Sequence, residues 1–459
     1  MKRKYECISW AVLVCSVMII FSSCEKYLDV KPDVAITTVE TLKDIRALLD
    51  NENRVNQTYP GLVELGTDDY YLNYEQISSQ YQLFQDVYFW NKEFVNTSNG
   101  NWQNSYGTIL VANVVMESLD RISTNDDVLK STLLGEAHFI RGLSFYYLAL
   151  VYSDTYQKGN DNESSGLPLR LTSDFNLKVK RSTLKETFEL IISDLKLAME
   201  LLPDQVIVKT RPSKVAAMAA LAKIYLYMQD YEQAELYASK VYGLMNNLID
   251  FNQLDVTSNR PFAALHEEMI YLAYSMEGAE LLNEDDVNIS PALYRQYDLD
   301  DLRKFIYFKD KGEGVIGFKG NYVGNFSTYF AGLSTNEIYL ILAECKIRRG
   351  RKMEGLQFMK KLLINRYRQG IYTVPQFNDD ISALKYVFTE RRKELLFRGV
   401  RWSDLKRLNL DPNFATTLKR ELNIAGDLKE FNLPPNDRRY IYPIPENAIV
   451  LGSLEQNVR

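Results

Sequence analysis

Histidine and cysteine are scarce in this sequence, and most of the usual signatures of catalytic chemistry are missing with them. The 459 residues include 2 histidines and 4 cysteines. No G-x-S-x-G, HExxH or P-loop motif occurs, and no cysteines are paired at metal-ligand spacing. His138 lies in an amphipathic segment beside Arg141, where a structural histidine is the better interpretation. We therefore expect a protein that is not an enzyme and has no cofactor, although abundant carboxylates leave glycoside hydrolysis open on composition alone.

Strong charge of either sign is also lacking. The formal net charge is −6, and no basic patch is large enough to indicate nucleic-acid binding. Acidic residues gather at Asp285-Asp286 and at Asp298, Asp300 and Asp301. Their oxygens suit calcium, but the glycine-centred spacing of an EF-hand loop is absent. We interpret them as solvated acidic loops and predict no metal site.

Long hydrophobic runs are absent after residue 21. The run Ile8–Phe21 follows the basic residues Lys2 to Lys4. As a helix it would be about 21 Å long, short of the roughly 30 Å hydrocarbon core of a membrane. Phe21-Ser22-Ser23-Cys24 is similar to a bacterial lipobox, so residues 1–23 are predicted to be a signal peptide and Cys24 the acylated cysteine. The alternative is an ordinary secretory signal or a short anchor.

Only one cysteine then remains inside the mature chain. Cys7 and Cys15 leave with the signal peptide, and Cys345 lies in a helical stretch. No disulfide within the chain is possible. We expect Cys345 to be a buried, inert thiol.

Amphipathic periodicity predicts a mainly α fold. Helices are expected over 39–49, 108–122, 129–152, from Ser182, from Pro212 or Ser213, over 338–363 and over 381–407. The order Leu221-Ala222, Tyr225, Ala234, Ala238 fits a tetratricopeptide-like helical hairpin, because small residues allow two helices to approach closely. Residues 338–363 hold a weaker copy, better explained by generic helix packing. Two regions, 24–250 and 251–459, are predicted.

Large irregular loops and a few short strands complete the predicted scaffold. Residues 51–107 are dense in aromatics among polar residues, which favours ordered functional loops. A strand is expected over 268–274, and loops with short strands over 298–332. Arg391, Arg401 and Asp404 are expected to pair with each other or with neighbouring helices, with Trp402 packed beneath.

Several segments together resemble the SusD/RagB family of surface lipoproteins in Bacteroidetes. The matching segments are Cys24-Glu25-Lys26-Tyr27-Leu28-Asp29, Trp102–Tyr106, Glu136-Ala137 with Arg141 and Phe145-Tyr146-Tyr147, Gly166-Leu167-Pro168, Arg181-Ser182-Thr183, Arg211-Pro212-Ser213-Lys214, Glu390–Leu395, Arg401–Leu405, Tyr442-Pro443-Ile444-Pro445 and Gln456-Asn457. The resemblance implies a lipid-anchored protein on the exterior of the outer membrane. It also implies a partner, a SusC-like TonB-dependent transporter, into which oligosaccharides or, in some relatives, peptides are passed.

Sugars stack on aromatic rings while polar side chains bond their hydroxyls. We therefore expect a glycan surface formed by the 68–90 segment and the 314–330 loops. The candidate residues are Asp68, Tyr70, Tyr71, Asn73, Trp90, Tyr322 and Tyr329. For each of them, core packing is the competing interpretation. A peptide-binding protein on the same scaffold and a glycosidase are the alternative functions.

Overall fold

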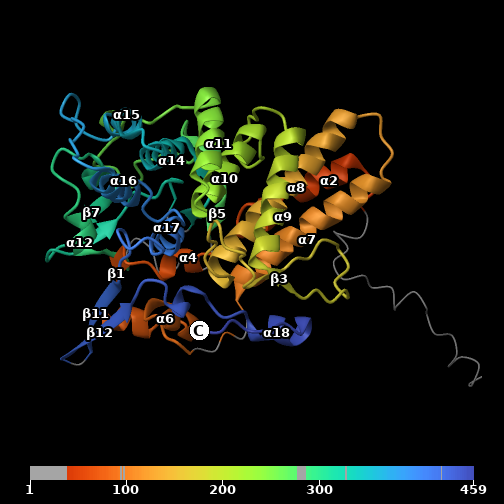
Figure 1. Ribbon diagram of the computed structural model, residues 1–459, viewed down its shortest axis with the longest axis horizontal. Coiled ribbons are helices and arrows are strands. Elements are labelled where there is room, and N and C mark those ends of the chain that lie inside the picture. The colour runs from red at the N-terminus through yellow and green to blue at the C-terminus, as the bar shows by residue number, and fades with distance from the viewer. Residues whose placement is uncertain (1–38, 94–95, 97–98, 276–285, 326–327, 425) are drawn as a thin grey trace, which may run out of the picture. The chain divides into compact units, whose positions relative to one another are not determined.

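Helices dominate the structure, a computed structural model that describes residues 39–93, 96, 99–275, 286–325, 328–424 and 426–459 (Figure 1). The chain divides into residues 1–41, of which only 39–41 are described, and a compact unit from Leu42 to Arg459. The predicted signal peptide and Cys24 lie outside the described residues.

The longer helices are α2 (Leu42–Leu49), α7 (Gly100–Arg121), α8 (Asp127–Tyr152), α9 (Leu184–Leu201), α10 (Lys214–Tyr227), α11 (Tyr231–Leu244), α14 (Thr335–Arg348), α15 (Lys352–Leu363), α16 (Asp380–Glu394), α17 (Arg401–Leu408) and α18 (Glu446–Gly452). The short helices are α3 (Glu52–Val55), α4 (Leu62–Leu65), α5 (Tyr74–Ser78), α6 (Gln82–Tyr88), α12 (Pro291–Tyr294) and α13 (Arg303–Ile306), with 3-10 turns at Phe251–Gln253 and Arg438–Tyr440.

The strands form small antiparallel pairs. These are β1 (Tyr70–Tyr71) with β6 (Asn288–Ile289), β2 (Ser165–Pro168) with β3 (Arg181–Thr183), β4 (Met269–Tyr271) with β10 (Leu333–Ser334), β5 (Tyr274–Ser275) with β9 (Tyr329–Phe330), β7 (Phe308–Asp310) with β8 (Ile316–Phe318), and β11 (Leu418–Ile424) with β12 (Asp427–Leu433). The strand predicted over 268–274 is confirmed as β4 and the start of β5.

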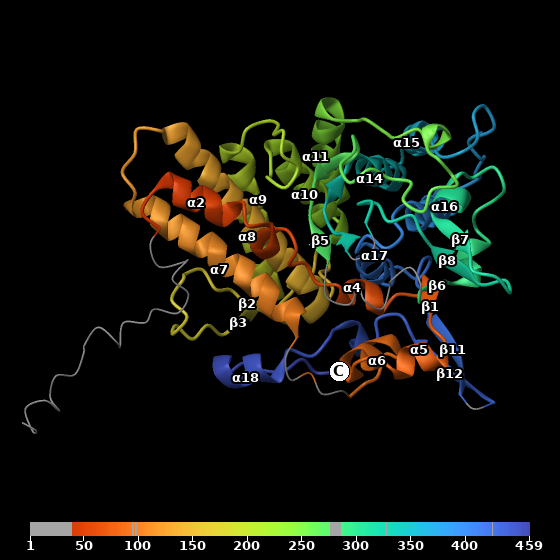
Figure 2. The ribbon, with the colours of Figure 1, turned by 180° about the vertical axis from the view of Figure 1, so that it is seen from behind.

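Each long helix packs against the next along the chain, from α7 to α11, and α11 packs against α14. This is the predicted mainly α scaffold of tetratricopeptide-like hairpins. Both ribbon views place α5, α6, the β11–β12 hairpin and α18 in a layer below the long helices (Figures 1 and 2). The α11–α14 contact crosses the predicted boundary at residue 250. Among the described residues, no helix has the combined length and apolar character of a membrane span.

The α10–α11 hairpin has the close packing that its alanines predict. The five alanines of α10 are at most 1% exposed. Tyr225 of α10 stacks on Tyr237 of α11, with ring centroids 5.7 Å apart and planes 4° from parallel. Ser213, one of the two residues from which this helix was predicted to start, caps α10 by accepting a hydrogen bond from the Ala216 amide.

The α8–α9 pair encloses a buried polar cluster. Gly142 permits the close approach, because a Cβ there would lie 3.3 Å from the Ile191 carbonyl oxygen. Arg141 donates two hydrogen bonds to Asp194, both 2.8 Å long. His138 Nδ1 lies 2.7 Å from the same carboxylate, so this histidine has the structural role expected of it.

Four details differ from the predictions. The helix expected from residue 108 begins at Gly100. The helix expected from Ser182 begins at Leu184, and its cap is Thr183, in a capping box with Glu186. The helix predicted over 381–407 is two helices, because Phe397 and Gly399 have φ values of 54° and 68° in the left-handed region.

The fourth difference concerns Asp301, which is fully buried instead of solvated. Its carboxylate accepts two hydrogen bonds of 2.8 Å from Arg303, and Lys393 Nζ lies 2.7 Å away. Arg303 also pairs with Glu390 and Glu394. This carboxylate therefore neutralises buried cations that the fold supplies from α13 and α16.

Candidate ligand-binding site

Three distant segments meet at a cleft of about 280 Å³. Its walls come from β1, the β6–α12 connection and β11. The lining residues are Asp68, Tyr70, Tyr71, Tyr88, Ser290, Pro291, Lys419, Arg420 and Glu421. We call it the Tyr71 cleft. Figure 1 shows two of the strands that form its walls, β1 and β11, close together on the left.

The two residues of β1 have opposite environments because side chains alternate along a strand. Tyr70 is 2% exposed, and its hydroxyl donates to the Leu65 carbonyl oxygen at 2.8 Å. Tyr71, opposite Asn288 of β6, is only half-buried. Partial burial and the nearby Tyr88 raise the pKa of Tyr71, so its hydroxyl stays protonated and able to donate. Among the candidate rings, Tyr71 is the one placed to meet a ligand.

Arg420 forms the floor of the Tyr71 cleft. Its guanidinium is 3.9 Å from the ring centroid of Tyr88 and 4.9 Å from that of Trp90. It also donates to the backbone carbonyls of Tyr70 and Thr67. These contacts hold the aromatic residues of the 68–90 segment in place around the buried guanidinium group of Arg420.

Trp90 packs against Arg420 and is not among the residues that line the cleft. It is 1% exposed, and its indole N–H donates to the Gly66 carbonyl oxygen at 2.8 Å. Both faces and the polar edge of the ring are therefore enclosed or used by protein groups. In this structure a sugar has no access to the ring.

Tyr322 and Tyr329 lie in the core, away from the Tyr71 cleft. Each is 4% exposed. The Tyr322 hydroxyl donates to Glu268 at 2.6 Å, and the Arg398 guanidinium lies 3.8 Å from its ring centroid. Tyr329 packs edge-on against Phe397. Tyr322 and Tyr329 therefore pack inside the protein, and neither is among the lining residues of the Tyr71 cleft.

Asn73 is exposed and caps α5. Its side-chain oxygen accepts from the Gln76 amide at 2.8 Å, while the Gln76 side chain accepts from the Asn73 amide at 2.9 Å. This capping box fixes the chain just after Tyr71.

Asp68 lines the cleft but is held by two arginines. Arg401 Nε donates to it at 2.9 Å, and Arg392 Nη2 lies 3.0 Å away. Burial alone would raise the pKa of Asp68, but the two guanidinium groups hold that pKa well below its usual value. The expected pairing of Arg391 with Asp404 is present, at 2.8 Å. Arg401 pairs instead with Asp68, which lies in the irregular segment before β1 and not on a helix.

Lys419 and Glu421 were not predicted as site residues. They alternate with the buried residues Leu418, Arg420 and Leu422. This period of two, followed by Gly426-Asp427, is a hairpin signal in the sequence. Nothing in the sequence placed the hairpin beside β1. Ser290 and Pro291 were missed for the same reason.

Two carboxyl groups line the Tyr71 cleft, and one of them, that of Asp68, is already engaged in ion pairs with the scaffold. A glycosidase needs two carboxyl groups, one of them protonated. Asp68 is held as a carboxylate by two arginines, which leaves Glu421 as the other acid lining the cleft. An aromatic face, a hydroxyl, an ammonium and a carboxylate instead suit recognition of a polar, ring-shaped ligand.

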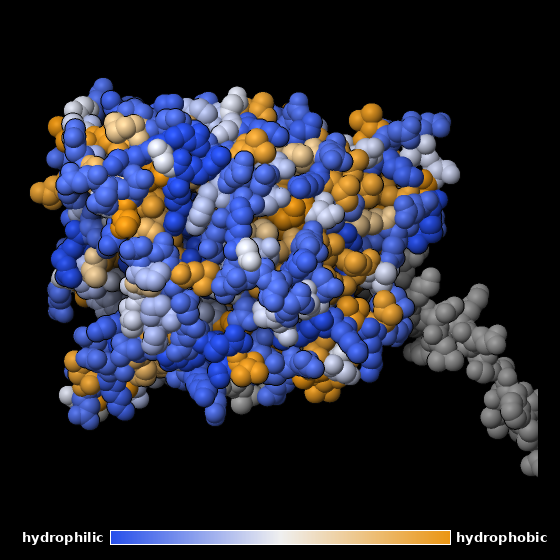
Figure 3. Space-filling model, in the orientation of Figure 1, coloured by the Kyte–Doolittle hydropathy of each residue, from blue (hydrophilic) through white to orange (hydrophobic). Residues whose placement is uncertain are grey.

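A shallower groove of about 460 Å³ lies beside α9, lined by Tyr156, Phe188, Glu189, Ile192, Ser193, Lys196, Leu197, Glu200, Tyr225 and Met228. Apolar residues gather over α8 and α9 on the face shown in Figure 3, within a largely hydrophilic surface. The walls of the groove are mainly apolar, so a hydroxyl-rich ligand would find few hydrogen-bond partners there.

Comparisons with known proteins agree with the fold. Residues 26–226 match a family model described as starch-binding and associating with the outer membrane, and residues 335–458 match the model of the SusD family. The SusD-like protein P2 of Formosa agariphila is 24% identical over 417 residues, 74% of this chain and 80% of that protein. SusD-like protein P38 of the same organism is 26% identical over 318 residues, 64% of this chain and 58% of that protein.

Solved structures have the same architecture. A putative sugar binding protein from Bacteroides vulgatus superposes with a TM-score of 0.74 at 21% identity, covering 92% of this chain and 99% of that one. A SusD superfamily protein from Bacteroides thetaiotaomicron gives 0.74 at 19% identity, covering 91% and 100%. At such identities the likeness establishes the shared fold.

Proposed function

Because this chain belongs to the SusD/RagB family, we propose that it is a cell-surface lipoprotein that binds oligosaccharides and delivers them to a SusC-like TonB-dependent transporter. The family descriptions support binding of sugar and association with the outer membrane. The lipobox-like Phe21-Ser22-Ser23-Cys24 supports attachment through an acylated Cys24, with the protein facing the exterior.

The observation that carries this proposal is the half-buried ring of Tyr71 between three polar walls. A pyranose has apolar C–H faces and a rim of hydroxyls. One face would stack on Tyr71, while Ser290, Lys419 and Glu421 lie where they can bond the rim. Asn73 and Asp68 hold the segment on either side of Tyr71. Among the residues predicted from the sequence, we therefore propose Tyr71 as the one that contacts the sugar, with Asn73 and Asp68 holding it in position.

The rigid surroundings support binding with little rearrangement. The capping box of α5, the Arg420 floor and the Asp68 ion pairs all hold β1 in place. A site ordered before the ligand arrives loses less entropy on binding.

The test is a binding screen on the mature chain from Cys24, with the cysteine replaced by serine to prevent acylation. We expect calorimetry to detect binding of at least one neutral oligosaccharide, and no new reducing ends on long incubation. Binding of peptides instead of glycans would move the assignment to peptide uptake, and turnover would make the protein a glycosidase. For the partner, the acylated, tagged protein should co-purify from its native membrane with a TonB-dependent transporter.

A further inference from the structure

Exposed apolar side chains gather where the connection between β2 and β3 meets α18. In the connection, Leu171, Phe175 and Leu177 are 47%, 70% and 50% exposed. In α18, Val450 and Leu451 are 75% and 77% exposed, and no residue of this helix is buried. On the face shown in Figure 3, hydrophobic side chains are visible at the place of α18, below and to the right of the centre.

Hydrogen bonds join these two elements. Lys178 Nζ donates to Ser453 Oγ, just after α18, at 3.4 Å. Arg181 donates to the carbonyl oxygen of Glu455 at 3.1 Å. The apolar side chains of both elements therefore flank the same contact. Residues 170–181 and α18 form one surface, which we call the Phe175 surface.

The β2–β3 connection is held in shape with Phe175 at its turn. The Asn113 side chain of α7 donates to the two backbone carbonyl oxygens on either side of Leu171, at 3.0 and 3.1 Å. The Asp174 side chain accepts a hydrogen bond of 2.9 Å from the Asn176 amide, which turns the chain around Phe175. An ordered backbone therefore presents these apolar side chains to solvent, as expected of a contact surface.

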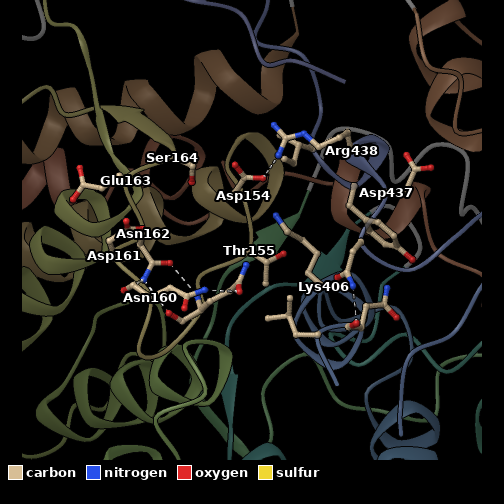
Figure 4. A pocket seen from close by; sticks show the side chains of 16 residues that line it. Asp154, Thr155, Asn160, Asp161, Asn162, Glu163, Ser164, Lys406, Asp437 and Arg438 are labelled. Atoms are coloured by element: carbon tan, nitrogen blue, oxygen red, sulfur yellow. Dashed lines mark hydrogen bonds and ion pairs between the residues drawn. The ribbon is translucent and has the colours of Figure 1, made fainter. Parts of the chain in front are cut away.

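The α18 segment is likewise held at both ends. The Gln456 side chain exchanges two hydrogen bonds of 2.8 Å with the backbone of Ile444, which closes the loop that carries α18. Beyond this loop, Arg438 donates to the Val458 carbonyl oxygen at 3.1 Å and pairs with Asp154 (Figure 4). The base of the loop is thus fixed to the scaffold, while the helix buries none of its own side chains.

The charge of the Phe175 surface is opposite in sign to that of the whole chain. Residues 170–181 contain four basic residues and one acidic residue, whereas the formal net charge of the protein is −6. The basic residues are Arg170, Lys178, Lys180 and Arg181. The hydrogen bonds that they form go to neutral oxygens, and none of the four is ion-paired within the part of the chain that the structure describes. Glu446 and Glu455 flank α18, so the surface as a whole keeps a small positive charge.

This protruding surface suits a lipid bilayer better than a folded protein. Its residues are not among those that line the Tyr71 cleft, the groove beside α9 or the cavity of about 540 Å³ shown in Figure 4. Protein partners gain most of their binding energy from side chains that fill such pockets. Apolar side chains bordered by lysine and arginine are instead what peripheral membrane proteins present to anionic headgroups.

We propose that the Phe175 surface contacts the lipid bilayer beside which the chain is held. Phe175 and Leu451 insert into the headgroup region, while Lys178 and Lys180 pair with lipid phosphates. In both ribbon views the β11–β12 hairpin lies at the other end of the lower layer from α18 (Figures 1 and 2), so this contact leaves the Tyr71 cleft uncovered. The presence of a membrane beside the chain rests on the proposed function, whereas the surface and its test do not.

The test uses the unacylated mature chain with Cys24→Ser and phosphatidylcholine vesicles in which about a third of the lipid is phosphatidylglycerol. Co-sedimentation should show binding about fivefold or more tighter than to pure phosphatidylcholine, and about 0.5 M salt should remove this preference. Phe175→Ser with Leu451→Ser should weaken binding about tenfold, and Lys178→Gln with Lys180→Gln about fivefold or more.

Matched controls remove the same kinds of group elsewhere. Ile207→Ser with Leu265→Ser removes two exposed apolar side chains, and Lys360→Gln with Lys385→Gln removes two exposed ammonium groups from α15 and α16. Both controls should bind the vesicles as the unsubstituted chain does. The fluorescence of Phe175→Trp should shift to shorter wavelength on anionic vesicles, because the other tryptophans of the mature chain are buried.

Thermal melting of each variant checks the fold. The proposal is overturned if the chain does not bind anionic vesicles, if the controls lose as much affinity as the surface variants, or if Phe175→Trp shows no shift. If Phe175→Ser with Leu451→Ser loses the transporter in co-purification but keeps its vesicle binding, the surface belongs to a protein partner and the proposal is equally wrong. Failure to bind any glycan would overturn the proposed function and leave the vesicle result standing.

Discussion

Arg401 and Asp68 lie 333 positions apart in the chain, yet their side chains form a two-point ion pair with distances of 2.9 and 3.2 Å. Arg392 of α16 lies on the other side of the same carboxylate. The irregular segment that presents Tyr71 is therefore tied to the helical scaffold by charge as well as by packing.

Replacing Arg401 by alanine should destabilise the protein by about 2–3 kcal/mol. This loss is smaller than the ~3–5 kcal/mol expected on breaking a fully buried ion pair, because part of each side chain here reaches solvent. Urea unfolding is the measurement. The matched control is Arg211→Ala, which breaks the more exposed pair with Asp50 and should cost less than about 1 kcal/mol. Equal losses would show that the Asp68 pair contributes no more than a surface contact.

Glu64 should make stability fall as pH rises. Burial raises the pKa of this carboxyl to about 8, with a further contribution from Asp69, while the Gly399 amide that donates to it opposes the change. The folded state then keeps a proton that the unfolded chain releases near pH 4.3. Between about pH 4.5 and 8 this contributes a loss of roughly 1.4 kcal/mol per pH unit.

The measurement compares urea unfolding of the wild type and Glu64→Gln from pH 5 to 8. The difference between the two proteins should grow with pH in favour of the variant. Asp68 does not interfere, because its lowered pKa affects stability only in more acidic solution. A constant difference across this range would mean that Glu64 is ionised in the folded protein.

Tyr71→Ala should weaken glycan binding by about tenfold to a hundredfold and leave the melting temperature nearly unchanged, since the ring is half-exposed. Trp90→Ala should instead cost about 3–5 kcal/mol of folding free energy, because it empties a buried site. Calorimetry and thermal melting separate the two effects. Tyr81→Ala is the control, as Tyr81 is 79% exposed and outside the cleft. Unchanged affinity in Tyr71→Ala would remove this ring from the site.

Cys345 should not react with thiol reagents in the folded protein. It is 0% exposed, and burial raises the pKa of its thiol well above the usual value. In a chain starting at Glu25 it is the one cysteine, so labelling in denaturant should reach one thiol per chain. Ser123→Cys, at an exposed loop position, is the control that should label at once. Rapid labelling of native Cys345 would indicate local opening of α14.

The helical scaffold was predictable because its signals are local. Ser213 caps α10 three residues before its bonding partner, and the alanines of the α10–α11 hairpin lie within one continuous stretch. The break between α16 and α17 was missed. Gly399 marks it in the sequence, but the left-handed conformation of Phe397 has no such marker.

The candidate site was only partly predictable. The 68–90 segment was identified from its aromatic residues, yet β1 is two residues long, too short for alternation to indicate which tyrosine faces solvent. Arg420, which holds the Tyr70 backbone, lies 350 positions further along the chain. No local pattern connects these two residues.

The sequence by itself determined the family, the mainly α architecture and the segment in which the Tyr71 cleft lies, since periodicity, caps and motif order are properties of neighbouring residues. Only the tertiary structure decided that Trp90 and Tyr70 enclose an arginine while Tyr71 remains open, and that β11 forms the opposite wall. Exposure is the sum of contacts from every segment that packs around a side chain, and here those segments lie hundreds of positions apart.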